Sequence, residues 1–278
     1  MSGPGLPGRA PDESRWRGGA VGDALCVLAP NPGPMTLDGT NTWVLHPAGA
    51  ADAVVIDPGP DDETHLRAVL AAVEERGARV REILLTHGHL DHSEGARRFA
   101  ALAGTRRVRA LDPAHRLGDE GLGDGDVVAV ADLELRVLAT PGHTADSLSF
   151  VLPSQAAVLT GDTVLGRGTT VVAHPDGALG PYLDSLRRLR DLARETGIAT
   201  VLPGHGPVLA DALAVIEHYL EHRAARLEQV RAAVAAGASG AREVVETVYA
   251  DVDPVLWPAA ELSVRAQLEY LGSEGRHS

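Results

Sequence analysis

The sequence contains no lysine, so all 25 of its basic side chains are arginines. This absence excludes Schiff-base chemistry and any phosphate-binding loop that depends on a lysine. Only nine residues are aromatic, so the core must be built from Val, Leu, Ile and Ala. The chain also lacks a run of about 20 apolar residues, the length that spans a bilayer. We therefore expect no membrane association.

Cysteine is nearly absent as well, because Cys26 is the only one. A single cysteine excludes an internal disulfide and fits a reducing compartment. It lies in the apolar run 25–28, which predicts burial as a small hydrophobic residue. Residues 1–19 are rich in Gly and Pro and lack the apolar segment of a signal peptide. We expect a disordered leader over residues 1–19 and a cytoplasmic protein.

Acidic side chains outnumber basic ones, 38 to 25, and the formal net charge is −13. This excess disfavours broad, sequence-independent binding to nucleic acid, although a local basic patch can survive it. The candidates for such a patch are two groups of arginines, Arg106, Arg107 and Arg109, and Arg187, Arg188 and Arg190. The favoured alternative is a solvated face on which these arginines pair with Asp and Glu.

Short apolar runs alternate with helical patterns through the first three quarters of the chain. Strands are expected at residues 24–28, 42–45, 53–56, 83–85, 108–110, 126–130, 133–138, 147–152, 156–159 and 200–202. Helices are expected at residues 62–76, 93–103, 182–196 and 211–235. This order predicts a layered α/β or α+β domain. Two further helical patterns follow residues 237–240, in a segment too small to hold a sizeable core alone, so we expect it to pack on the main domain.

One stretch, ILLTHGHLDH at residues 83–92, carries three histidines and an aspartate directly after an apolar strand. Side chains at positions i and i+2 of an extended segment point the same way, so His87 and His89 can converge on one ion. The chain then turns towards a helix near Ser93, which aims Asp91 and His92 at a neighbouring point. Imidazole and carboxylate together suit zinc and similar metals.

Three more segments repeat the order of strand, glycine-containing loop and potential ligand. They end at His143, Asp162 and His205. Glycine beside a ligand permits a tight turn and a close backbone approach. Four strand ends that each deliver such a residue predict a metal site at one end of a sheet core.

The remaining histidines carry weaker signals. We interpret four of them as surface or turn residues: His46, His65, His115 and His277. His218 and His222 lie four residues apart on a helix and could bind a metal, but a solvated helix face is the favoured interpretation. His174 follows a β-branched run, so it could border the site.

The motif HGHLDH at residues 87–92, followed by His143, Asp162 and His205, resembles the metallo-β-lactamase-fold hydrolase superfamily over about residues 20–210. The resemblance implies a four-layered αβ/βα sandwich with metals in a cleft at one edge. It implies two zinc ions per chain, with manganese or iron as substitutes. The implied ligands are His87, His89 and His143 for the first metal, Asp91, His92 and His205 for the second, and Asp162 as the bridge. Asp57 matches another superfamily motif, whose aspartate usually supports the ligands or the fold.

A closer resemblance is to the β-lactamase-like protein 2 type, whose animal member is a mitochondrial endoribonuclease. It rests on NPGPMTLDGTNT at residues 31–42, GTT at 168–170 and PGHGPV at 203–208. It implies a catalytic domain over residues 20–210, then a linking helix and a small winged-helix-like α domain over residues 211–278. Fungal thioesterases that release polyketides from carrier proteins share the first of these motifs. Asp162 stands where zinc-dependent β-lactamases have cysteine, and His89 where flavodiiron proteins have glutamate.

Together these patterns predict a dinuclear metal-dependent hydrolase in which Asp91 orients the nucleophile and passes a proton to the leaving group. One substrate hypothesis is single-stranded RNA, which the closer resemblance supports. The other is an acyl thioester of coenzyme A, glutathione or a carrier protein, which the acidic balance and the scarcity of stacking aromatics favour. A non-catalytic interaction protein is disfavoured by the intact ligand set. A homodimer is compatible with the sequence.

Overall fold

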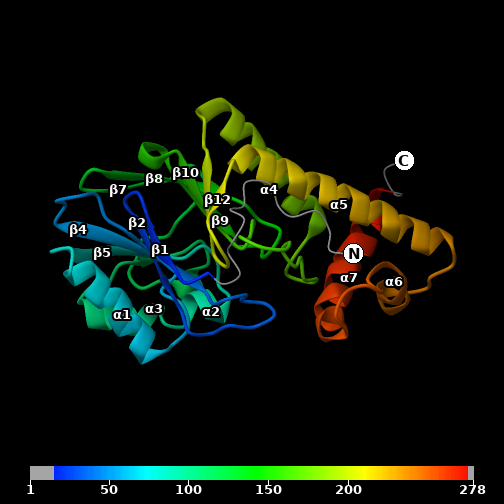
Figure 1. The fold of residues 1–278 in the computed structure, drawn as a ribbon, viewed down its shortest axis with the longest axis horizontal. Coiled ribbons are helices and arrows are strands. Elements are labelled where there is room, and N and C mark those ends of the chain that lie inside the picture. Colours follow the sequence, from blue (N-terminus) through cyan, green and yellow to red (C-terminus); the bar gives the residue numbers. More distant parts are fainter. Residues whose placement is uncertain (1–15, 275–278) are drawn as a thin grey trace.

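The computed structural model describes residues 16–274, and two six-stranded sheets form its centre (Figure 1). The first sheet follows chain order: β1 (Gly19–Val21), β2 (Ala24–Leu28), β3 (Asn41–Leu45), β4 (Asp52–Ile56), β5 (Arg79–Leu84) and β6 (Val108–Arg109). The second contains β7 (Val127–Val130), β8 (Leu133–Ala139), β9 (Leu148–Leu152), β10 (Ala157–Gly161), β11 (Thr200–Pro203) and β12 (Leu209–Ala210). Both sheets are mixed, because β4, β5 and β6 run parallel in one and β10 and β11 in the other.

Three apolar clusters separate four layers of secondary structure. Helices α1 (Glu63–Glu74) and α3 (Ala96–Ala103) cover the outer face of the first sheet. Helices α4 (Leu179–Thr196) and α5 (Ala212–Ala235) cover the outer face of the second. Side chains of both sheets, Trp43 and Phe150 among them, meet in the cluster between the sheets. The predicted four-layered sandwich is thereby confirmed.

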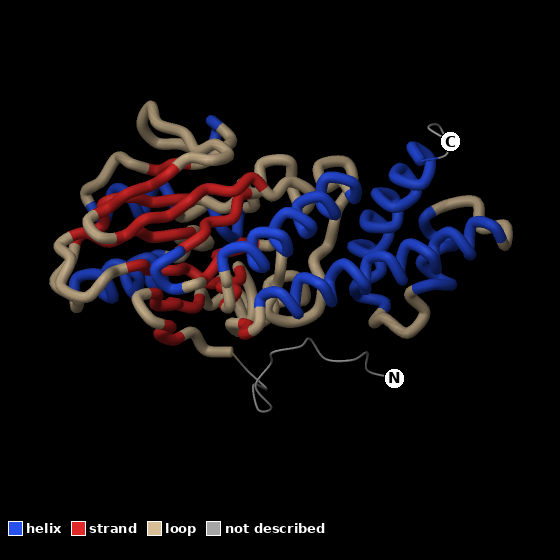
Figure 2. The backbone as a smooth tube through the Cα atoms, turned by 90° about the horizontal axis from the view of Figure 1, so that it is seen from above, coloured by secondary structure: helices blue, strands red, loops and turns tan. Residues whose placement is uncertain are grey.

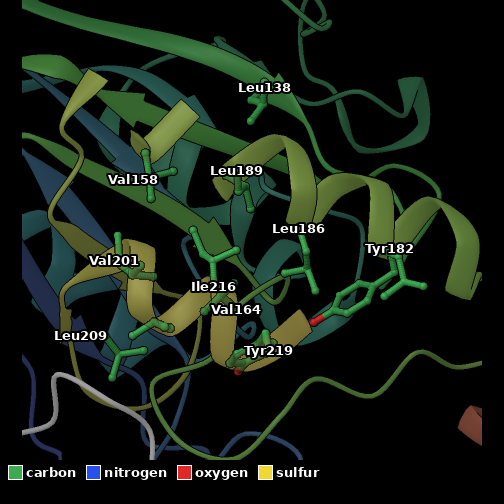
Figure 3. Packing of buried hydrophobic residues seen from close by; sticks show 14 of the residues in the cluster. Leu138, Val158, Val164, Tyr182, Leu186, Leu189, Val201, Leu209, Ile216 and Tyr219 are labelled. Carbon is green, nitrogen blue, oxygen red and sulfur yellow. The ribbon is translucent and has the colours of Figure 1, made fainter. Parts of the chain in front are cut away.

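Strand β4 is apolar at every position from Ala53 to Ile56, rather than at alternate positions. Val54 and Ile56 face the other sheet, whereas Ala53 and Val55 face the helices, and all four are fully buried. A strand covered on both faces needs apolar side chains at every position. On the other side of the molecule, Leu186 and Leu189 of α4 pack with Ile216 of α5 against the second sheet (Figure 3).

The C-terminal segment forms a small helical unit at the far end of α5 (Figure 2). Helices α6 (Ala241–Val248) and α7 (Trp257–Glu274), with the short 3₁₀ turn η3 (Pro254–Leu256), enclose a core with the second half of α5. Ala266 of α7 joins the buried cluster of α4 and α5, so the unit packs on the main domain as expected. Among the described residues after β12 the secondary structure is helical only, without a β-wing.

The predicted elements are present with small shifts at their ends. The helix expected at residues 93–103 is split at Glu94 and Gly95 into α2 (Leu90–Ser93) and α3. The short edge strands β1 and β12 were not predicted. Cys26 is buried as expected, and burial raises the pKa of its thiol to about 12. No helix in the described range is long and apolar enough to cross a membrane.

The prediction of a disordered leader is wrong for its last residues. The indole N–H of Trp16 donates to Asn41 Oδ1 at 2.8 Å, and Trp16 packs against the cluster between the sheets. Gly19 then begins β1, which pairs with β2. The indole ring of Trp16 and its buried partner Asn41 hold residues 16–19 in place, although their composition predicts disorder. Residues 1–15 of the predicted leader lie outside the described residues.

Candidate metal centre

The seven predicted ligands meet at one edge of the sandwich, in the segments that follow four strands. His87 and His89 follow β5, Asp91 and His92 lie in α2, and the others follow β8, β10 and β11. Three groups have all their donor atoms within 4.8 Å of one another: His87, His89 and His143; His87, His92 and Asp162; and Asp91, His92 and His205. The structure therefore brings together every residue that the sequence singled out for this site. That they hold metal stays a prediction.

Each of four histidines has an acceptor behind its ring, which sets its tautomer. The Nδ1 atoms of His92, His143 and His205 lie 2.9, 2.7 and 3.2 Å from Asp57 Oδ2, Val171 O and Gly39 O respectively. His87 Nδ1 lies 2.9 Å from Thr86 Oγ1, whose own hydrogen points to Asp57. With the proton on Nδ1, Nε2 carries a lone pair that faces the cluster.

Lone pairs that face one another at short range repel, and a cation between them would relieve this repulsion. His92 Nε2 lies 3.2 Å from His205 Nε2, and Asp91 Oδ2 lies 3.1 Å from His205 Nε2. Asp162 Oδ1 is buried and has no hydrogen-bond partner. Zn–N bonds of about 2.0–2.1 Å at tetrahedral angles place donor atoms about 3.3 Å apart, close to these separations. The residues present therefore fit a metal cluster.

The electrostatics of the ligands agree with this interpretation. Burial lowers the pKa of His87 and His143, so both rings stay neutral and keep their lone pairs. Burial opposes ionisation of Asp91, yet its hydrogen bond to His205 and the charge of His92 bring its pKa to about 2. Burial also works against the charge of His205, but the Asp162 carboxylate raises its pKa well above the usual value. A positive charge, proton or metal, is stabilised among these groups.

Gly204 shows how closely the backbone approaches the cluster. A Cβ atom at this position would lie 2.5 Å from Asp162 Oδ1 and 2.8 Å from His92 Cε1. We expect Gly204→Ala to displace both ligands and weaken metal binding by about tenfold or more, an effect of the size seen when ligand support is lost. Competition with a chromogenic chelator measures it. Gly237→Ala is unsuitable as a control because φ is +107° there, but Gly240→Ala meets open space at ordinary φ. Equal metal affinity in Gly204→Ala and wild type would contradict the prediction.

Asn41 is a site residue that no sequence pattern singled out by itself, although it lies in the NPGPMTLDGTNT motif. Its Nδ2 donates to Pro203 O at 2.9 Å and to Gly206 O at 2.8 Å. These two carbonyls flank His205, so Asn41 fixes the loop that presents this ligand. The place of Asn41 in the NPGPMTLDGTNT motif is the one sequence signal that could have identified it.

Asp57 lies behind the ligands, where the resemblance implied. It is 1% exposed, and its carboxylate also accepts from the backbone N–H and the hydroxyl of Thr86. The carboxylate thus supports His92 directly and His87 through Thr86.

The other histidines differ partly from expectation. The surface interpretation is wrong for His65, which is buried with Nε2 2.9 Å from Thr42 Oγ1. His46 closes a turn onto Ala50 O but is also buried. His115 is half-buried in a turn. His277 lies outside the described residues.

His174 and the His218/His222 pair lie outside the ligand groups. His174 Nδ1 lies 2.9 Å from Glu269 Oε2 of α7, so this side chain links its loop to the C-terminal unit. His222 does not lie on a fully solvated face: it is half-buried and lines a cavity beside the cluster. Burial, with the charges of Arg223 and Arg226, lowers its pKa to about 4.

The two arginine groups are mostly paired with acids, as the favoured alternative predicted. Arg107 pairs with Glu82 and Glu120, and Arg109 lies 4.0 Å from Glu120. The pairs in the second group are Arg187 with Asp184, Arg188 with Asp124 and Arg190 with Asp191. Neither group lines the cavity beside the cluster.

That cavity has a volume of about 400 Å³ and lies between the main domain and the C-terminal unit. His143 and Asp162 line it on the cluster side. Its walls are largely apolar, with Met35, Leu37 and Leu165 from the main domain and Val252, Leu256 and Ala260 from the C-terminal unit. It can take an apolar group whose reacting bond lies at the cluster.

Comparison with known proteins agrees with this geometry. Residues 35–205 match the family described as "Metallo-beta-lactamase superfamily". This chain belongs to the metallo-beta-lactamase superfamily. Residues 241–276 match the "Beta-lactamase associated winged helix domain", which confirms the predicted kinship of the C-terminal unit. Members of the superfamily are generally hydrolases and typically bind divalent metals.

Several superfamily relatives cover most of the chain. A "Beta-lactamase-like protein 2 homolog" of Caenorhabditis elegans is 32% identical over 257 residues, 90% of this chain and 84% of the relative. An "Atrochrysone carboxyl ACP thioesterase" of Aspergillus fumigatus is 32% identical over 239 residues, 80% of this chain and 72% of the relative. The crystal structure of a metallo-beta-lactamase family protein from Thermus thermophilus has a TM-score of 0.74 and 25% identity, covering 92% and 95% of the two chains.

Proposed function

We propose that this superfamily member is a dinuclear zinc-dependent hydrolase that cleaves thioesters or esters with an apolar acyl group. The observation that carries the substrate class is the apolar cavity whose lining includes His143 and Asp162. Apolar walls with a few convergent polar groups are the usual form of a small-molecule site. The thioesterase of Aspergillus fumigatus among the relatives supports the same class.

The ligand groups divide naturally into two positions. His87, His89 and His143 would hold one cation, and Asp91, His92 and His205 the other, with Asp162 in contact with both sets. Two divalent cations bound there would supply Lewis acidity and a water of lowered pKa. The protein orients the four supported imidazoles through the acceptors behind them, and burial keeps those of His87 and His143 neutral.

Asp91 is the residue proposed to orient the attacking water. Its side chain is 29% exposed, whereas that of His92 is fully buried, so Asp91 combines a ligand position with access to solvent. Its Oδ2 accepts from Thr40 Oγ1 at 3.3 Å, which holds the carboxylate in place. A pKa of about 2 keeps the carboxylate ionised at neutral pH, so it is available both as a ligand and to orient the attacking water by accepting a hydrogen bond.

Cleavage of single-stranded RNA is the second candidate, supported by the beta-lactamase-like protein 2 homologs among the relatives. The cavity also carries arginines that could meet phosphate. Against it, the two exposed arginine groups are mostly paired and lie away from the cavity. A cytoplasmic location and a homodimer stay predictions.

A substrate panel tests the proposal. We expect zinc-reconstituted protein to hydrolyse octanoyl-N-acetylcysteamine, and chelation to reduce the rate by about 100-fold or more, because metal activation of water is worth several kcal/mol. A single-stranded RNA oligonucleotide and a β-lactam complete the panel. Metal-dependent cleavage of the RNA without thioester turnover would reverse the substrate assignment.

A further inference from the structure

Helix α5 places three basic side chains against the cavity: His222, Arg223 and Arg226. Positions 222 and 226 lie one helical turn apart and therefore share a face. Arg223 is only 7% exposed, donates to Thr170 O and lies over the Tyr182 ring at 4.9 Å. Arg226 donates to Val248 O at 2.7 Å and lies over the Tyr249 ring at 4.3 Å. Both guanidinium groups are held by carbonyl and aromatic contacts rather than by acids.

Two polar atoms of these three side chains still lack a hydrogen-bond partner. Arg223 Nε and His222 Nδ1 are buried and have no hydrogen-bond partner. Across the described residues, no carboxylate lies within ion-pair distance of Arg223 or Arg226, whereas the third cavity arginine, Arg167, pairs with Asp38 at 2.9 Å. A buried cation without a counter-charge is costly, so this arrangement favours an incoming anion.

The acids near the cavity do not supply that counter-charge. Asp162 is the one carboxylate among the described lining residues, and it belongs to the ligand cluster. The cavity therefore carries carboxylate and imidazole groups on the cluster side, apolar walls, and basic groups on the α5 side. A ligand that matches all three is amphipathic and anionic.

We propose that the α5 side of this cavity recognises an anionic group of the substrate, with Arg226 and Arg223 as specificity-determining residues. This inference rests on the proposed hydrolase function. It adds recognition of an anionic group, which the hydrolysis itself does not require. Guanidinium is well suited to a carboxylate or a phosphate, since it offers several donors in a fixed plane. The anion can be a carboxylate on the acyl group or a phosphate on the leaving thiol.

Three thioesters of the same acyl length distinguish these sources. Octanoyl-N-acetylcysteamine has no anion, octanedioyl-N-acetylcysteamine has a terminal carboxylate, and octanoyl-coenzyme A has phosphates on the thiol. The measured quantity is the ratio of kcat/KM for each anionic substrate to that for the neutral one. We expect Arg226→Gln to lower one ratio by about 10- to 100-fold, the range for a hydrogen bond to a charged group.

Arg226→Lys should retain most of that ratio, because it keeps the charge. Arg231→Gln is the matched control, since Arg231 is exposed on the same helix and pairs with Glu228. A fall confined to the octanedioyl ratio assigns the acyl carboxylate, and one confined to the coenzyme A ratio assigns the phosphate. Ratios that change no more in Arg226→Gln than in Arg231→Gln overturn the proposal.

A binding measurement on chelator-treated full-length protein separates this inference from the proposed function. Isothermal titration with octanoate should show binding that Arg226→Gln weakens at least about tenfold relative to wild type and to Arg231→Gln. Octanamide, the neutral isostere, should bind more weakly than octanoate to wild type. Equal octanoate affinity in wild type and Arg226→Gln, with a coenzyme A ratio that Arg226→Gln also leaves unchanged, overturns the inference. Binding that depends on Arg226 in a protein that hydrolyses no thioester leaves the anion site standing and refutes the proposed function.

Discussion

Replacing Asp162 by alanine should abolish high-affinity metal binding and lower kcat/KM by about 1,000-fold, equivalent to about 4 kcal/mol of lost metal-supplied stabilisation. Its carboxylate lies 3.3 Å from His205 Nε2, 3.6 Å from His143 Nε2 and 3.4 Å from His92 Nε2. It therefore touches both proposed cation positions. Without it, the remaining ligands are mostly neutral imidazoles, which leave two divalent charges close together with little compensation.

Elemental analysis after zinc reconstitution measures the loss directly. Wild type should retain about two equivalents per chain, as a dinuclear site requires, and Asp162→Ala less than one. Thermal unfolding gives a readout independent of activity, since a ligand that binds the folded state raises Tm and chelation removes that gain. Asp132→Ala, at an exposed turn, is the control. Asp162→Ala protein that keeps two zinc ions would refute the assignment of the bridge.

The candidate ligands could be predicted because each lies within a few residues of a strand end. An apolar run ending in glycine and a polar side chain places that side chain at a sheet edge, and strands that share a layer bring such edges together. His87, His143, Asp162 and His205 all follow this logic. The resemblance added which residues share an ion, a pairing that the spacing alone left open.

Residues that act through tertiary contacts carried no such signal. The pattern around His65 predicts a surface residue on α1, yet this side chain is buried against Thr42 of β3. The spacing of His218 and His222 favours a solvated helix face, yet His222 lines a cavity together with Arg223 and Arg226. That cavity is completed by a unit some 20 to 40 residues further along the chain. Trp16 lies in a segment whose composition predicts disorder, and its partner Asn41 is 25 residues away. The local sequence pattern does not indicate a contact with a residue that lies far away along the chain.

Asp57→Asn should weaken metal binding by about 10- to 100-fold, the usual cost of losing a partner behind a ligating histidine. The carboxylate receives three hydrogens, from Thr86 N at 2.8 Å, Thr86 Oγ1 at 2.7 Å and His92 Nδ1 at 2.9 Å. An amide can accept on one side only. Asparagine tolerates the left-handed backbone at this position, where φ is +50°, so the change isolates the hydrogen bonding.

Both orientations of the new amide have a cost. If its NH₂ replaces Oδ1, it meets the backbone N–H of Thr86, and an unsatisfied buried donor costs about 1–3 kcal/mol of unfolding free energy. If it replaces Oδ2, it faces His92 Nδ1, which must then accept, and the ring proton moves to Nε2. That proton occupies the lone pair that faces His205 and the proposed cation. In this second orientation, which leaves the Thr86 N–H satisfied, the variant favours the tautomer that cannot bind metal.

The tautomer shift gives Asp57→Asn a signature that general destabilisation lacks. Burial opposes the charge of His92, but the Asp162 and Asp57 carboxylates raise its pKa above the usual value, so the comparison is made at alkaline pH, where the ring carries one proton. There, nitrogen chemical shifts of His92 in metal-free protein should report the proton on Nε2 in the variant and on Nδ1 in wild type. Excess zinc should restore much of the activity, because cation binding pulls the ring back to the competent tautomer. Asp52→Asn is the matched control: Asp52 begins β4, the strand that Asp57 follows, and pairs with the exposed Arg79. This variant should change neither readout. Unchanged zinc affinity with His92 still protonated on Nδ1 would show that Asp57 supports the fold of β4 rather than the ligand set.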